Sequence, residues 1–478
     1  MRSPFRAPPS RRPNYQRIFP TDRALAAAIR AKRIVGELLD TGAEGFAPRP
    51  LAEDAAAFDW DAAAEDPASL GSFTTSALGE RLGVLLNVEL VPAAHGRIDE
   101  ILLTVPPFTD DNGEPYPDWP VDFYYERHLR RLIELLGPGR TFTIVCHHYQ
   151  RDRVREWIDE AGISRDDLQL ALSVFDYSIW AQDAYVALTA PFQGPMLAEG
   201  VLFPRYDDMS VADDVAAQTP TSALQSYLYF QGGNILGSPT AHLIGADYVW
   251  RNTGRAGLET EAKVLDRFSR LFGGDAIALG RHDPIPVAHR RQGLSGIFQP
   301  IFHIDMYVTP TGVTGSSGKE IALVGRPSKA REILGQGPGP FDFDEYFQET
   351  AEQLEAAFEV RSLPLLPEYG DLGGRARPAY YHLTWNNAVL ENHTDDADTL
   401  HRVVYMPTFA EDADDHGTDG AVRQTLDDAA AGIWQETGFE VRRMDGLEDL
   451  AYGAGSIHCI TKTLRRSGFA ANHSPGGG

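Results

Sequence analysis

The sequence contains little cysteine and little lysine. Only two cysteines, Cys146 and Cys459, occur in 478 residues. So few thiols exclude a disulfide framework and the closely spaced cysteine pairs that bind zinc. In a reducing compartment, a lone cysteine is either a small buried apolar residue or a reactive thiol. The local sequence around each cysteine therefore has to decide between the two.

Long hydrophobic runs are also absent. The longest apolar stretches, such as residues 101–108 and 168–175, have the length of a strand and are far too short to span a membrane. Residues 2–17 are basic and rich in proline, and no apolar segment of a signal peptide follows them. These features predict a cytoplasmic protein that does not interact with membranes.

The charge is strongly acidic. The formal net charge is −25 and the pI is about 4.9, which argues against a nucleic-acid partner because no basic face would easily outweigh that field. An acidic surface attracts cations, including guanidinium compounds. Solubility alone explains the charge at least as well, so the charge excludes a class of partner without selecting one.

Strand and helix patterns alternate along most of the chain. We expect an arm without regular structure at residues 1–20, an accessory helical segment at 21–95, a catalytic domain at 96–465 and a flexible tail at 466–478. The expected strands are 97–108, 141–147, 167–175, 226–230, 242–250, 276–280, 301–308, 320–325, 359–365, 380–390, 401–407 and 439–444. The expected helices are 125–136, 153–161, 260–272, 344–357 and 421–437. Some five similar βαβ-containing units indicate an α/β fold, either closed like a propeller or open and doubly wound.

Unusual polar groups gather at four predicted strand ends, where α/β proteins place their sites. The segments are Trp180-Ala181-Gln182-Asp183, Gln231-Gly232-Gly233-Asn234, His303-Ile304-Asp305 and Gly455-Ser456-Ile457-His458-Cys459-Ile460-Thr461. Each has an ordinary explanation when taken alone: a capping aspartate, a glycine turn, a buried His–Asp pair, a core cysteine. On a strand, His303, Asp305 and Tyr307 would share one face, because side chains repeat every two residues.

Taken together, the four segments fit one reaction. The thiolate of Cys459 can attack the carbon of a guanidinium group, and Asp183 and Asp305 can hold the guanidinium nitrogens in paired hydrogen bonds. His303 can protonate the departing amine and then deprotonate a water molecule. We therefore expect these four residues to be catalytic.

These motifs resemble those of the guanidino-modifying (pentein) superfamily, which includes agmatine, arginine and peptidylarginine deiminases and the amidinotransferases. His303-x-Asp305 and Gly455-x-x-His-Cys459-x-Thr461 match the superfamily motifs. The segment from Trp180 to Asp183 is similar to that of peptidylarginine deiminases, whereas agmatine deiminases usually have arginine before the aspartate. In place of the acidic residue that many members carry before the two glycines, this chain has Gln231.

The resemblance implies a fivefold pseudo-symmetric ββαβ propeller over about residues 96–465. It implies that Trp180 lies along the alkyl chain of the substrate. The further substrate-binding residues that it indicates are Gln231, Gly232, Asn234 and Asn387.

The predicted function is a deiminase that converts the guanidino group of peptidyl-arginine, agmatine or a related compound to a ureido group, releasing ammonia through a thiouronium on Cys459. An amidinotransferase and a non-catalytic binding protein are the alternatives. No cofactor is expected. The acidic loop at 412–417 opens like a calcium loop but has Arg423 at its twelfth position, so no metal site is predicted there, although calcium stays open. Cys146 is interpreted as structural, and a homo-oligomer is left open.

Overall fold

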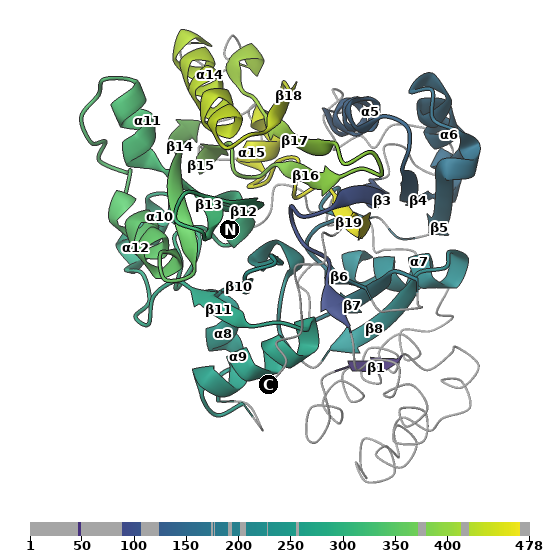
Figure 1. Ribbon diagram of the computed structural model, residues 1–478, viewed down its shortest axis with the longest axis horizontal. Helices are drawn as coiled ribbons and strands as arrows, with labels where there is room; N and C mark the ends of the chain where they lie inside the picture. Colours follow the sequence, from purple (N-terminus) through teal and green to yellow (C-terminus); the bar gives the residue numbers. More distant parts are fainter. Residues whose placement is uncertain are drawn as a thin grey trace.

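In a computed structural model of the chain, the described residues form a mixed α/β fold in which the helices lie at the periphery and the sheets nearer the middle (Figure 1). The structure describes residues 46–48, 88–106, 124–173, 175, 177–189, 194–200, 207–226, 228–254, 258–370, 379–412 and 420–468. The predicted arm at 1–20, most of the predicted accessory segment at 21–95 and the end of the predicted tail lie outside these residues. Within the described part, no helix combines the length and the apolar character needed to cross a bilayer.

The described residues form five sheets, and each contains the same unit: an antiparallel strand pair followed by a helical crossover to a parallel strand. In one sheet, with order β19-β3-β4-β5, the C-terminal strand β19 (Lys462–Ser467) pairs antiparallel with β3 (Arg97–Val105). The parallel partners are β4 (Thr141–His147) and β5 (Leu168–Ser173), reached through α5 (Tyr124–Leu136) and α6 (Arg151–Glu160). Strands from near the two ends of residues 88–468 therefore share a sheet.

The next two sheets repeat the unit. The first has the order β1-β8-β7-β6-β2, with β1 (Phe46–Pro48), β2 (Glu89–Leu90), β6 (Tyr185–Thr189), β7 (Met196–Glu199), α7 (Val211–Gln218) and β8 (Ser222–Ser226). The second contains β9 (Ile235–Leu236), β10 (His242–Gly245), α8 (Ala246–Asn252), α9 (Glu261–Phe272) and β11 (Ala276–Leu279). In both, the crossover strand pairs parallel with its predecessor.

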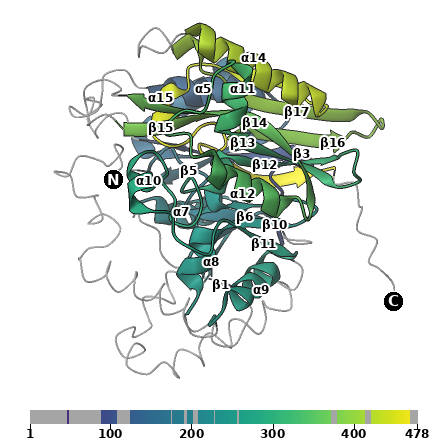
Figure 2. The same cartoon turned by 90° about the vertical axis from the view of Figure 1, so that its left-hand side faces the viewer.

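The last two sheets follow the same order. One contains β12 (Val308–Thr314), β13 (Glu320–Arg326), α11 (Pro327–Ile333), α12 (Asp344–Leu354), β14 (Phe358–Gly370) and β15 (Ala379–Thr384), and β12 pairs antiparallel with β13. The other contains β16 (Val389–Thr394), β17 (Leu400–Pro407), α14 (Gly420–Glu436) and β18 (Glu440–Met444). Helix α14 lies on one outer surface and α8 and α9 on the opposite one (Figure 2).

Several predicted strands are wrong in part. Strand β8 ends at Ser226, whose hydroxyl accepts the N–H of Leu228, and residues 228–230 are not in a strand. The segment 242–250 turns from strand to helix after Gly245, because the carboxylate of Asp247 accepts the backbone N–H groups of Ile297 and Phe298 and thereby fixes the start of α8.

The predicted strand 380–390 is two strands in different sheets, separated by residues 385–388. The side chain of Asn386 donates to the carbonyl of Leu323, and the N–H of Ala388 donates to the carbonyl of Asn386 itself. These bonds bend the chain in the middle of an apolar run. The bend matters because it contains Asn387, one of the predicted substrate-binding residues.

A buried ion pair links α14 to α15 (Glu448–Tyr452), the helix that precedes the Cys459 turn. Two nitrogens of the Arg423 guanidinium donate to the two carboxylate oxygens of Glu448 at 2.7 and 2.6 Å, and both side chains are at most 2 % exposed. A cation and an anion removed from water to this extent stabilise the fold only as a pair.

Replacing Glu448 with alanine leaves the Arg423 charge buried without its partner. We expect Glu448→Ala to lower the free energy of unfolding by about 3–5 kcal/mol, measured by urea denaturation. The double variant Arg423→Met/Glu448→Leu should lose much less. As a control, Glu440→Ala removes an exposed pair with Arg442. A loss for Glu448→Ala no larger than that of an exposed pair, about 1 kcal/mol, would contradict this account.

Candidate active site

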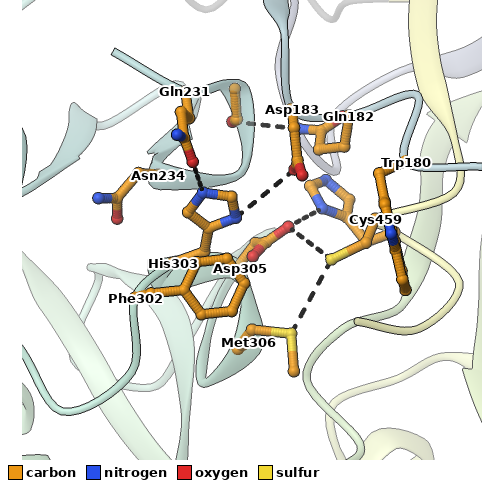
Figure 3. Close-up of polar contacts among 12 residues, drawn as sticks. Trp180, Gln182, Asp183, Gln231, Asn234, Phe302, His303, Asp305, Met306 and Cys459 are labelled. Carbon is orange, nitrogen blue, oxygen red and sulfur yellow. Dashed lines mark hydrogen bonds and ion pairs between the residues drawn. The ribbon is translucent and has the colours of Figure 1, made fainter. Parts of the chain in front are cut away.

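The structure brings together the four residues predicted to be catalytic, although they come from three separate turns (Figure 3). Asp183 lies between β5 and β6, and His303 and Asp305 lie just before β12. Cys459 lies between α15 and β19. All four are buried, with exposed fractions between 1 and 4 %. Their location in turns lets groups from different sheets reach one place.

The Cys459 thiol contacts a carboxylate and an amide. Its sulfur lies 3.5 Å from Oδ2 of Asp305 and 3.9 Å from the sulfur of Met306. The amide Nδ2 of Asn387 donates to the sulfur at 3.1 Å, while Oδ1 of the same amide accepts the N–H of Cys459 at 3.1 Å. Asn387 therefore fixes the position of the cysteine backbone and also favours the thiolate form of the side chain.

His303 lies between two oxygen acceptors. Its Nε2 is 2.5 Å from Oε1 of Gln231, and its Nδ1 is 3.5 Å from Oδ1 of Asp183. A neutral imidazole has one donor and one acceptor nitrogen, so it satisfies only one of these oxygens. An imidazolium has two donor nitrogens and can satisfy both oxygens, and it is also the form that can protonate a leaving group.

The sequence analysis missed a second imidazole, that of His458. Its Nδ1 lies 2.8 Å from Oδ2 of Asp305, the same oxygen that faces Cys459. Each of the two carboxylates therefore has its own histidine partner. The signal was present in the sequence, because His458 directly precedes Cys459 in the terminal motif.

Two glycines permit the close approach of these groups. A Cβ atom on Gly233 would lie 2.5 Å from Nδ1 of His303, and one on Gly455 would lie 2.1 Å from the Trp180 ring. Any side chain at either position would push a site residue away. The N–H of Gly232 also donates to the carbonyl of Asp183 at 2.7 Å, which joins the glycine turn to the carboxylate turn.

The remaining predicted residues have distinct positions. Trp180 lies beside Cys459, and the N–H of Gln182 donates to the Cys459 carbonyl (Figure 3). Asn234 is fully buried, and its Oδ1 accepts the N–H of Ile304 at 3.0 Å. Asn234 therefore holds the turn that carries His303, and contact of this residue with a substrate stays a prediction.

The predicted strand at 301–308 is wrong before Val308. Residues Ile304–Met306 form a 3₁₀ turn, because Oδ1 of Asn234 accepts the N–H of Ile304. In a strand, this N–H would donate to a carbonyl of the neighbouring strand. His303 and Asp305 consequently meet through the turn and not through a shared strand face. Tyr307 packs against Phe347 instead of pointing with them toward the site.

Burial and negative charge act on the thiol in the same direction. Burial, followed by the neighbouring carboxylates of Asp305 and Asp183, raises the pKa of Cys459 well above its usual value. The free site therefore holds a protonated thiol at neutral pH. Burial likewise raises the pKa of Cys146 to about 12, and this residue packs in the core, as its structural interpretation requires.

The described residues contain no group of three or more histidine, cysteine, aspartate or glutamate side chains arranged to bind a metal ion. Residues 413–417 of the acidic loop considered for calcium lie outside the described part of the chain.

Solved structures share this fold. The agmatine deiminase of C. jejuni has a TM-score of 0.53 and 11% sequence identity, with 80% of this chain and 96% of that chain covered. The agmatine deiminase of Enterococcus faecalis gives a TM-score of 0.53, 11% identity and the same coverage, 80% and 96%. No protein-family model and no curated protein matches the sequence. The likeness to agmatine deiminases is thus confirmed at the level of the fold.

Because the thiol is protonated at neutral pH, we expect iodoacetamide to alkylate Cys459 slowly at pH 7. The rate should still rise about tenfold per pH unit above pH 9, since the thiolate is the reactive form. Peptide mass spectrometry after timed labelling measures each cysteine separately, and Cys146 provides the internal control. A rate that levels off below pH 8 would show that the carboxylates do not act on the thiol as described.

Proposed function

We propose that this protein is a hydrolase that removes ammonia from the guanidino group of an arginine-like substrate. The observation that carries the proposal is the buried Cys459 thiol beside two buried carboxylates, Asp183 and Asp305, each of them paired with a histidine. Such a site combines a nucleophile, a binding place for a planar cation and a proton donor. The fold shared with agmatine deiminases agrees with it.

The carboxylates select for a guanidinium cation. Oδ1 of Asp305 is buried and has no hydrogen-bond partner among the described residues, so it is a ready acceptor for a guanidinium N–H. A guanidinium presents its donors in one plane, and carboxylates bind such donors in pairs. Two buried negative charges also attract a cation far more strongly than they would in water. Neutral ureido products lack that attraction and are released.

Substrate binding also activates the nucleophile. The same carboxylates that raise the pKa of Cys459 are neutralised when a guanidinium lies between them. A cation at that place favours the thiolate, and the N–H of Asn387 stabilises it further. The thiol therefore ionises mainly when its target is present.

The first half-reaction forms a bond between the Cys459 sulfur and the guanidinium carbon. The thiolate adds to this carbon, the imidazolium of His303 protonates one amino nitrogen, and the C–N bond breaks to release ammonia. The carbon then remains attached to sulfur as a thiouronium cation, held by Asp183 and Asp305. Trp180 and Asn387 limit the positions from which the substrate can approach the sulfur.

The second half-reaction consumes water. The neutral His303 takes a proton from a water molecule, whose oxygen attacks the thiouronium carbon. The C–S bond breaks, Cys459 leaves as a thiolate and takes up the proton that remains on the oxygen, so a neutral ureido group and the thiol result. One guanidinium and one water thus yield one urea derivative and one ammonium ion. Transfer of the amidino group to an amine would use the same intermediate and is the alternative outcome.

We propose agmatine and peptidyl-arginine as the substrates to test first. The fold shared with agmatine deiminases supports the former, and the Trp180-x-Gln-Asp183 segment, which is similar to that of peptidylarginine deiminases, supports the latter.

We also propose that the five sheets are the blades of a closed propeller over residues 96–465. The bridge between Gly96 and Asn392, which joins two of these sheets, supports that arrangement.

Ammonia release tests the function directly. Wild-type protein should release ammonia from at least one of agmatine, arginine and a peptidyl-arginine, and Cys459→Ser should lose this activity by about 10⁴-fold or more. The matched control is Cys146→Ala, which removes the other cysteine and should keep the activity. No ammonia from any of the three guanidines would refute the proposal. A new guanidine product when glycine is added would indicate an amidinotransferase.

Gln231 is a neutral hydrogen-bond partner of His303. In Gln231→Glu a carboxylate replaces the amide oxygen at 2.5 Å, and its charge stabilises the imidazolium. We expect the alkaline limb of kcat to move upward by about one pH unit or more. Gln231→Met, which removes the acceptor without adding charge, is the control and should move it down. An identical limb in all three proteins would argue against His303 as the acid.

A further inference from the structure

A buried lysine lies beside the carboxylates and has no part in the reaction described above. Lys462 is the first residue of β19 and is 5 % exposed. A Cβ atom on Gly232 would lie 2.9 Å from its Nζ, and its Nζ is 5.9 Å from the centre of the Tyr185 ring. The ammonium group is therefore next to the glycine turn that positions Asp183.

The charged and titratable groups around Lys462 come from several elements. Asp183 and Asp305 attract its charge from their two turns, and Tyr185 of β6 presents its ring. His458 lines the same small pocket as Lys462. On β3, the carboxylate of Glu100 is bonded to Thr143 and interacts with Arg465. The carboxylates that attract the Lys462 ammonium are thus those of the site itself.

Burial is a large cost for this ammonium. It lowers the pKa of Lys462 to about 7, and the attraction of Asp183 and Asp305 offsets only part of that effect. Burial of an ammonium group destabilises the fold, and a buried group with a perturbed pKa beside a site is a candidate functional residue. The group is also poised to change its charge near neutral pH.

We propose that Lys462 is a positioning residue that tunes the site through its charge. It offsets the two carboxylates in the free protein, favours the thiolate of Cys459 and weakens the binding of the guanidinium. The inference rests on the proposed function, since it assigns a second cation to the same site.

The two effects have opposite consequences for catalysis. A charged Lys462 partly cancels the effect of the two carboxylates on the pKa of Cys459. The thiolate therefore forms more readily than it would without the lysine charge. The same positive charge repels a substrate cation that is bound between Asp183 and Asp305, so substrate binding is weaker. Removing the charge should therefore tighten binding and slow the chemical step. If Lys462 were only structural, its replacement would not tighten substrate binding and slow the chemical step together.

The pH dependence follows from the same charge. Below pH 7, Lys462 carries its proton and opposes the guanidinium; as the pH rises through 7 it becomes neutral. The KM for a guanidine should then fall as the pH rises through neutrality in the wild-type protein. In a variant without the charge, this component of the pH dependence disappears.

The test compares Lys462→Met and Lys462→Gln, which remove the charge, with Lys462→Arg, which keeps it. Lys319→Met is the matched control, because Lys319 binds the carbonyl of Glu355 on the surface, away from the site. In ligand-free protein below pH 7, where Lys462 carries its proton, the neutral variants should alkylate Cys459 with iodoacetamide about tenfold more slowly than the wild type, which corresponds to one unit in the pKa of the thiol. Lys462→Arg should restore the rate.

Alkylation needs no substrate, so it decides the proposal even if no guanidine is ever turned over. With an active substrate, the neutral variants should also show a lower KM and a lower kcat. The proposal is overturned if either neutral variant folds, as judged by circular dichroism, and alkylates Cys459 at the wild-type rate. It is equally overturned if kcat and KM stay unchanged while only the thermal stability falls.

Discussion

The site depends on one electrostatic constraint: two carboxylates and a thiol are buried close enough for their charges to interact. Asp183 and Asp305 are almost completely removed from water, and the sulfur of Cys459 lies 3.5 Å from one of them. Like charges in a medium of low dielectric constant repel strongly unless cations and hydrogen-bond donors surround them. The protein meets this constraint partly with its own groups and, in our proposal, partly with the substrate cation.

The compensating groups come from different sheets, and each is held by backbone geometry. Asn387 comes from the bend between β15 and β16 and donates to the sulfur, while His458 binds Asp305 from the cysteine turn. The glycine turn before β9 contacts the carbonyl of Asp183 and leaves no room for a side chain. Because the sheets meet at these turns, a small displacement of any one of them alters the charge balance of the whole site.

Much of the fold could be predicted from patterns in the sequence. Amphipathic helices such as α9 and α14, and strands such as β4 and β17, match their expected ranges closely, because their apolar periodicity reflects the burial of one face. Two of the errors occur where a side chain bonds to the backbone of a distant segment. Asn234 accepts the N–H of Ile304 before β12, Asn386 donates to the carbonyl of Leu323 after β15, and no local pattern records such long-range bonds.

The sequence alone determined which chemical groups the site contains, because nucleophile, acids and imidazole stand in short motifs of recognisable composition around Asp183, Gln231, His303 and Cys459. Only the tertiary structure decided which groups touch. It paired His303 with Gln231 and Asp183, His458 with Asp305, and it placed the Lys462 ammonium beside the glycine turn. The physical reason is range: composition fixes the chemistry of each side chain, whereas charge and hydrogen bonding act over a few ångströms between segments far apart in the chain.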